Sequence, residues 1–168
     1  MKNCGLGIAR IHLRVNAAQL SSALRADLKI DSDAEIADRS ALDAAARKAA
    51  DAAGRPVNFA AIFNERMTAR RQFMLCAQIL KHIDNDTPIR FLIAECEAPA
   101  TVMGAIYLAR LYGVDRRLDI SPLFETPEAI ERGGRFMERL LAEPEYLSYI
   151  RARGRIAVQA GFSDSGRF

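Results

Sequence analysis

Two acidic residues, Glu125 and Asp164, each follow an apolar run and could be presented where a strand ends. Arg14 lies near the end of another such run, and Glu95 and Glu97 follow a third. Carboxylate oxygens are ligands that suit Mg²⁺ or Mn²⁺, and a guanidinium can pair bidentately with a phosphate or a carboxylate. Brought together, these residues would make a divalent-cation site that faces an anion. An alternative stays open, because acids at strand ends often do no more than cap the next helix.

Four short segments have the pattern of strands that could carry these residues. The first alternates apolar and polar residues, which is typical of a strand with one buried face, and the others are short apolar runs. They are "IARIHLRV" at 8–15, "IRFLIAEC" at 89–96, "RLDISPLFE" at 117–125 and "RIAVQAGF" at 155–162.

Helical segments separate the four strands. Ser32 and Glu35 have capping-box spacing and open a helix that closes on Gly54, although its alanine-rich face offers little to a core. The remaining helical segments are 63–83, 99–113, 127–143 and a helical turn that begins at Pro144. The first of these has an apolar stripe at helical spacing. The pair Gly133-Gly134 predicts a kink or break in the third of these.

Strands that alternate with helices predict an α/β fold with a parallel sheet and right-handed crossovers. In such folds the functional groups gather at the carboxyl ends of the strands, where the residues named above would lie. The sequence has neither a G-x-G-x-x-G fingerprint nor a Walker P-loop, which argues against doubly wound nucleotide binders.

Composition sets further bounds. The 168 residues suit one domain-sized segment, 1–168, and a net charge of +3 is too small to argue for a nucleic-acid partner. Arg far outnumbers Lys, which fits either planar-anion binding or a GC-rich genome. The three cysteines, Cys4, Cys76 and Cys96, lack metal-ligand spacing, and no apolar run is long enough for a membrane span or a signal peptide. We therefore expect a cytoplasmic, soluble protein without a membrane partner.

Longer motifs resemble one enzyme family, phosphoenolpyruvate carboxylase. The segment "ISPLFETPEAIERGGRFMERLLAEPEYLSYI", followed by "AVQAGFSDSG", is similar to the family's P-L-F-E-T strand end and its later G-Y-S-D-S. Upstream, "GLGIARIHLR" resembles F-G-x-x-x-x-R-I-D-I-R, and "RFLIAECEAPATVMGAIYLAR" resembles Y-V-I-S-M-x-x-x-P-S-D-V-L. The resemblance runs in order along nearly the whole chain.

The resemblance implies a fold, a reaction and roles for three residues. The fold would be a partial (β/α)₈ TIM-type barrel, of which this chain supplies about four parallel strands with long, mostly helical connections. The reaction would be that of a carboxy-lyase, which joins phosphoenolpyruvate to bicarbonate with Mg²⁺ or Mn²⁺ and yields oxaloacetate and phosphate. By matching motif positions, Glu125 and Asp164 would be metal ligands and Arg14 a substrate-binding residue. The family also implies a homo-oligomer, a tetramer.

Several positions depart from the family's pattern. His12 stands where the family usually has Asp, Arg167 where Lys is common, and Phe168 where Asp is common. "CEAPATV" replaces T-P-S-D-V, so the helix that follows lacks an acid in its first turn. These departures indicate a divergent branch and leave the metal geometry open.

Two functional elements of the family have no counterpart in the sequence: the glycine- and arginine-rich loop and the motif of the catalytic histidine. Neither His12 nor His82 lies in that motif. We interpret His12 as a structural residue of the strand, and His82 as a residue near a helix C-terminus, where the helix dipole favours a cation. We therefore expect an internal fragment that is inactive alone and needs the remainder of the enzyme as its partner. The alternatives are a catalytically silent remnant that keeps residual metal or anion binding, and a small interaction module.

Overall fold

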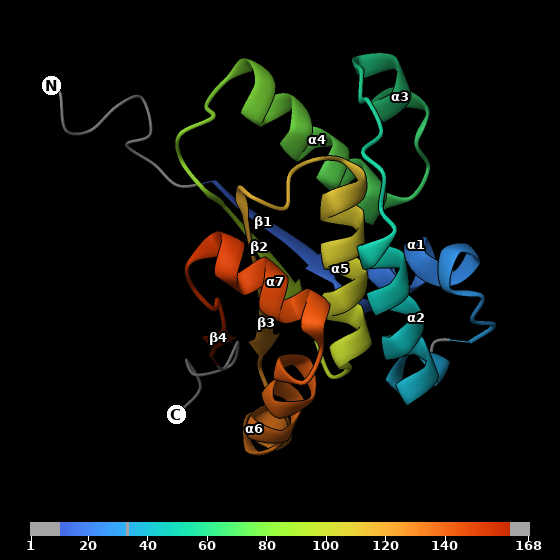
Figure 1. Ribbon diagram of the computed structural model, residues 1–168, viewed down its shortest axis with the longest axis vertical. Helices are drawn as coiled ribbons and strands as arrows, with labels where there is room; N and C mark the ends of the chain where they lie inside the picture. Colours follow the sequence, from blue (N-terminus) through green and yellow to red (C-terminus); the bar gives the residue numbers. More distant parts are fainter. Residues whose placement is uncertain (1–10, 33, 162–168) are drawn as a thin grey trace, which may run out of the picture.

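The computed structural model describes residues 11–32 and 34–161, and Figure 1 shows their arrangement. A four-stranded parallel sheet with the order β1-β2-β3-β4 forms its centre. The strands are β1 (His12–Asn16), β2 (Ile89–Ala94), β3 (Leu118–Phe124) and β4 (Gln159–Ala160). The predicted α/β class and parallel sheet are confirmed, while closure of eight strands into a TIM-type barrel stays a prediction.

Helices make up most of the connections. Between β1 and β2 lie α1 (Ala17–Leu28), the 3₁₀ turn η1 (Ala34–Ala37), α2 (Arg39–Ala50), α3 (Phe59–Asn64) and α4 (Thr68–His82). α5 (Pro99–Leu111) joins β2 to β3, and α6 (Pro127–Leu141) with α7 (Pro144–Arg153) joins β3 to β4.

The two faces of the sheet differ in their cover. Alternate residues of the first three strands are buried on the helix side: Val15, Ile89, Phe91, Ile93, Leu118 and Ile120. On this side α5 crosses the sheet (Figure 1), and Phe73 of α4 stacks on Phe91 with ring centroids 4.4 Å apart. On the opposite face the side chains of Arg14 and Arg90 are exposed. A parallel sheet with helices on one face only is the arrangement found in the wall of an α/β barrel.

The first helix, α1, was not predicted from the sequence, which shows only a polar, alanine-rich stretch there. Asn16 caps it: its side chain accepts a hydrogen bond from Ala18 N at 2.7 Å, and Gln19 completes a capping box. The predicted capping pair further along does form, since the Ser32 hydroxyl donates to Glu35 at 3.0 Å. It opens the turn η1, however, and the α-helix begins only at Arg39.

The expectation that the alanine-rich face of α2 adds little to the core was wrong. Ala41, Leu42, Ala45 and Ala49 are buried, and α2 packs closely on α5. Small side chains contribute here by letting two helix backbones approach. The same close packing recurs at Gly104 of α5, where an added Cβ would lie 2.2 Å from a methyl carbon of Leu24.

The predicted helix 63–83 is two helices, because the chain is extended at Glu65 and Met67 between α3 and α4. Its apolar stripe is partly confirmed: Phe73, Cys76 and Leu80 are buried, whereas Leu75 and Ile83 are exposed.

The predicted break at Gly133-Gly134 was also wrong, since α6 runs without interruption across both glycines. Gly133 faces the ring of Phe124, with 3.4 Å between an added Cβ and the nearest ring carbon, so it belongs to a packed contact. The predicted start of α6 is confirmed: Thr126 Oγ1 accepts from Ala129 N at 3.1 Å, and Pro127 is the first helical residue.

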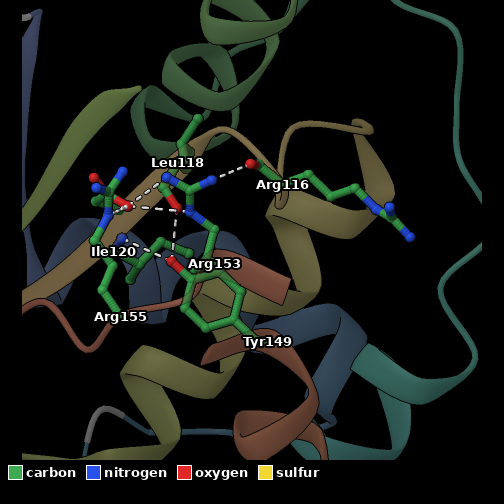
Figure 2. Close-up of polar contacts among 7 residues, drawn as sticks. Arg116, Leu118, Ile120, Tyr149, Arg153 and Arg155 are labelled. Atoms are coloured by element: carbon green, nitrogen blue, oxygen red, sulfur yellow. Dashed lines mark hydrogen bonds and ion pairs between the residues drawn. The ribbon is translucent and has the colours of Figure 1, made fainter. Parts of the chain in front are cut away.

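The last strand is much shorter than the predicted 155–162; residue 162 itself lies outside the described residues. Figure 2 shows why the first half of β3, which pairs with β2 on one side, does not pair with β4 on the other. The hydroxyl of Tyr149 accepts from Ile120 N at 2.9 Å and donates to Leu118 O at 2.7 Å, so a side chain occupies the β3 edge. Beside it, Arg153 and Arg155 both donate to the buried carboxylate of Asp119.

Candidate functional site

The carboxyl ends of β1, β2 and β3 bring together four polar side chains from distant parts of the sequence. They are Arg14 and Asn16 of β1, Glu95 directly after β2 and Glu125 directly after β3. The parallel register requires this meeting, because Val15 pairs with Ile93 and Ile93 with Pro122. We call these four residues the strand-end cluster.

Glu125 is the centre of the strand-end cluster. Its Oε1 accepts a hydrogen bond from Nη2 of Arg14 at 2.7 Å, and its Oε2 accepts from the backbone N of Glu95 at 3.2 Å. The Glu125 side chain is 14 % exposed, whereas that of Arg14 is 58 % exposed. The carboxylate is therefore fixed in place, and most of the guanidinium stays open to solvent.

Glu95 connects Glu125 to Asn16 within the cluster. It has a positive φ of 54°, a left-handed conformation that non-glycine residues seldom adopt and that costs of order 1 kcal/mol. This turn aims its backbone N–H at Glu125 and its side chain at Asn16, whose Nδ2 donates to Oε2 of Glu95 at 2.6 Å. Since Asn16 also caps α1, the cluster is tied to a helix start.

A cavity of about 630 Å³ lies beside the strand-end cluster. Its wall includes Asn16 and Glu95, together with residues from the first turns of α1, α5 and α6, and Arg132 further along α6. Unpaired N–H groups at the start of a helix favour negative charge. The cavity therefore combines three helix starts with an arginine, although Glu97 and Glu128 at its rim add negative charge.

Two cysteine thiols in the described part of the chain, Cys76 and Cys96, are buried and unreactive. Burial raises the pKa of Cys76 to about 12, and burial also raises the pKa of Cys96, which lines the cavity, with Glu97 adding to the effect. A thiol with a raised pKa carries almost no thiolate at neutral pH and is a poor nucleophile or metal ligand.

The predicted site residues have different outcomes. The structure brings Arg14, Glu95 and Glu125 together, while Glu97 lies on the cavity rim. Asp164, the predicted second metal ligand, lies outside the described residues. The substrate-binding role of Arg14 and the metal-binding role of Glu125 stay predictions.

Neither histidine joins the strand-end cluster. His12 is exposed on β1, and His82 ends α4, where it stacks on Phe59 with ring centroids 5.9 Å apart.

Sequence reasoning missed the part played by Asn16. The signal was present, because Asn16 follows the alternating run and precedes Gln19 by the three residues of a capping box. A residue that caps a helix immediately after a parallel strand lies by necessity at the carboxyl edge of the sheet.

The donor chemistry of the cluster fits a hard divalent cation. A carboxylate has about four lone-pair sites, and the two contacts of Glu125 leave others free. Magnesium is commonly held by one or two carboxylates plus water and substrate oxygens. In residues 11–32 and 34–161, no group of three or more His, Cys, Asp or Glu side chains could hold a metal ion.

No helix among the described residues is long and apolar enough to cross a membrane.

The sequence was compared with known families and proteins. The family profile of phosphoenolpyruvate carboxylase matches residues 4–167. Among individual relatives, the phosphoenolpyruvate carboxylase of Thermus sp. (strain 71) is 38 % identical over 74 residues, covering 41 % of this chain and 9 % of the relative. That of Aeromonas hydrophila is 37 % identical over 92 residues, covering 55 % and 10 %, and phosphoenolpyruvate carboxylase 3 of Sorghum bicolor is 29 % identical over 90 residues, covering 54 % and 9 %.

The match thus spans about a tenth of the length of each of these relatives. It nevertheless takes in nearly the whole chain at the level of the family profile, including every residue of the strand-end cluster. The chain belongs to the phosphoenolpyruvate carboxylase family.

Proposed function

We propose that this chain supplies part of the active-site edge of a phosphoenolpyruvate carboxylase. The enzyme would carboxylate phosphoenolpyruvate with bicarbonate in the presence of Mg²⁺ or Mn²⁺ and release oxaloacetate and phosphate. The observation that carries the proposal is the contact between Arg14 and Glu125, 2.7 Å apart although 111 positions separate them in the sequence. Both residues occupy motif positions of the family, and the fold puts them side by side at the carboxyl edge.

Glu125 would hold the divalent cation through its free lone pairs, with Asp164 as the proposed second ligand. A bound Mg²⁺ or Mn²⁺ acts as a Lewis acid that stabilises negative charge on phosphate and enolate oxygens. The backbone N–H of Glu95 keeps the Glu125 carboxylate oriented, so the ligand is preorganised and does not have to be recruited from solvent.

Arg14 would bind the substrate. One Nη2 contacts Glu125, and the exposed remainder of the guanidinium keeps donors for a phosphate or carboxylate oxygen. The same ion pair holds the guanidinium next to the proposed metal ligand, so that a single anion could contact both centres. The starts of α1 and α6 would add a favourable field for that anion.

The eight-stranded barrel, the remainder of the enzyme as partner and a tetrameric assembly are parts of the same proposal. The described sheet has the edge strands β1 and β4, where further barrel strands would add. The reaction's histidine and its glycine- and arginine-rich loop would come from that remainder, because no histidine of the described residues contacts the strand-end cluster.

A second candidate is a catalytically silent module that keeps only metal or anion binding. The salt bridge between Arg14 and Glu125 favours it, since each charge already has a partner within the chain. Both candidates predict metal or anion binding, and only the first predicts turnover.

A chimera tests the proposal directly. This chain would replace the matching segment of the Aeromonas hydrophila relative, and oxaloacetate would be measured by coupled reduction with NADH. Turnover that requires Mg²⁺ and falls at least a hundredfold in Arg14→Gln supports the enzymatic function. A folded chimera that binds Mn²⁺ without turnover supports the silent module, and a folded chimera without Mn²⁺ binding contradicts both.

A further inference from the structure

A second cavity, of about 510 Å³, lies at the other end of α5 from the strand-end cluster. Its lining residues come from the end of α1, the last turns of α2 and α5, and the loop that follows α2. Ten residues of α5 separate Thr101 at the first cavity from Leu111 at the second, which is about 15 Å of helix. We call this second cavity the basic groove.

Four cations line the basic groove: Lys29, Arg47, Lys48 and Arg55. All four are exposed, and none forms a salt bridge or a side-chain hydrogen bond with another described residue. Other arginines nearby behave differently: Arg39, Arg70 and Arg110 are each paired with a carboxylate. The four cations of the basic groove thus lack the carboxylate partners that these three arginines have.

The acids of the basic groove do not neutralise these cations. Asp27 is committed to Arg70, and it also accepts a hydrogen bond from the hydroxyl of Tyr107 at 3.1 Å. Only Asp51 remains as an uncommitted carboxylate in the lining. Four positive charges thus face one available negative charge.

Helix ends explain three of the cations individually but not the set. Lys29 caps the end of α1, and Arg47 and Lys48 are in the last turn of α2, where cations are favoured by the helix dipole. Arg55 lies outside any helix, and its backbone N is fixed by Leu111 O at 2.7 Å. Burial and then Asp27 raise the pKa of Tyr107, whereas the charges of Arg70 and then Arg55 lower it.

We propose that the basic groove binds a small phosphate-bearing polyanion. Arginine offers a planar fork that matches phosphate oxygens, and lysine offers a point charge, so the mixture suits a ligand with two phosphoryl groups. The volume is that of a small-molecule site. This site does not share residues with the strand-end cluster and does not depend on the proposed reaction.

The test uses the full 168-residue chain and pyrophosphate as the probe, with affinity measured by titration calorimetry. We expect saturable binding that weakens about tenfold in Arg47→Gln and again in Arg55→Gln, as for the loss of one charge-assisted hydrogen bond each. Arg135→Gln, which removes an exposed arginine of α6 outside the groove, should leave the affinity unchanged. Circular dichroism confirms that each variant is folded.

Three outcomes would overturn the proposal. The first is absence of saturable binding at millimolar pyrophosphate. The second is binding that weakens with Arg14→Gln and not with the groove variants, which would assign the anion to the strand-end cluster. The third is tighter binding of citrate, or binding of a single-stranded oligonucleotide that pyrophosphate fails to displace, since these would indicate a polycarboxylate or a nucleic-acid ligand. Loss of catalysis in the chimera would leave the groove result unaffected.

Discussion

At the scale of single residues, Glu125 has a different donor on each oxygen: a side chain from β1 and a backbone N–H from the end of β2. We predict that Glu125→Gln weakens Mn²⁺ binding at least tenfold, because an amide offers one neutral oxygen in place of a charged, bidentate group. The change would be measured by electron paramagnetic resonance of free Mn²⁺.

Glu131→Gln provides the matched control, since Glu131 is an exposed carboxylate on α6 outside the cluster. It removes the same charge and should leave Mn²⁺ affinity within twofold. Equal affinity in Glu125→Gln and the wild-type chain would contradict the metal-binding role. The role of Asp164 is tested in the same way by Asp164→Asn.

Tyr149 satisfies two backbone groups that a longer β4 would otherwise pair. Removing its hydroxyl in Tyr149→Phe leaves Ile120 N–H and Leu118 C=O buried without a partner. We expect the free energy of unfolding to fall by about 2–4 kcal/mol, since an unsatisfied buried polar group costs about 1–3 kcal/mol. Urea denaturation followed by circular dichroism measures this change.

Tyr146→Phe is the control, because Tyr146 is buried next to Tyr149 and its hydroxyl has no hydrogen bond to a described residue. It should cost less than about 1 kcal/mol. Similar costs for the two variants would show that the hydroxyl of Tyr149 does not stabilise the β3 edge.

At the scale of elements, α6 shows how a packed helix tolerates residues of low helix propensity. Two adjacent glycines predict a break, yet Thr126 and Pro127 fix its start, and Phe136 and Leu140 anchor it to the core. Gly134 has nothing within 4 Å of an added Cβ. We therefore expect Gly134→Ala to raise the free energy of unfolding by about 0.5–1 kcal/mol, which thermal denaturation would detect.

Gly154 offers the opposite case. It also has free space around an added Cβ, but its φ is +69° at the end of α7. Gly154→Ala should destabilise by about 1 kcal/mol. If both glycine variants changed stability in the same direction, backbone conformation would not be what distinguishes them.

The structure of a segment could be predicted where its own residues carry the signal. It could not be predicted where contacts with other elements determine it. Pro99, Thr126 and Pro144 mark helix starts through their own backbone chemistry, and the structure confirms each. The continuity of α6 and the buried alanines of α2 depend on contacts with other elements, which propensity does not report. The shortness of β4 has the same origin, because the competing partner of β3 is the side chain of Tyr149.

At the scale of the whole molecule, buried thiols and phenols link stability to pH. Burial raises the pKa of Cys76 to about 12 from its ordinary 9.0, and that of Tyr146 to about 12 from 10.0. In this pH range the folded chain keeps protons that the unfolded chain has lost. The free energy of unfolding should therefore be constant up to about pH 9 and fall as the pH rises toward 12, by about 1.4 kcal/mol per pH unit for each group.

Urea denaturation between pH 8 and 11 measures this decline. In Cys76→Ala the free energy of unfolding should fall less steeply between pH 9 and 10, because one titrating group is missing. This holds whatever the substitution costs at pH 7. A slope that does not change in the variant would mean that Cys76 contributes nothing to the linkage.

The sequence by itself determined the family, the α/β class and the order of the strands, because motifs, apolar runs and capping residues are local properties. It also placed Arg14, Glu95 and Glu125 at strand ends, and from the parallel sheet rule it predicted that they would meet. Only the tertiary structure decided which atoms touch: the left-handed turn at Glu95, the Asn16 contact and the pairing of Arg14 with Glu125 depend on the register of three strands. The basic groove likewise exists only in three dimensions, because its four cations come from two helix ends and a loop that approach one another over the end of α5.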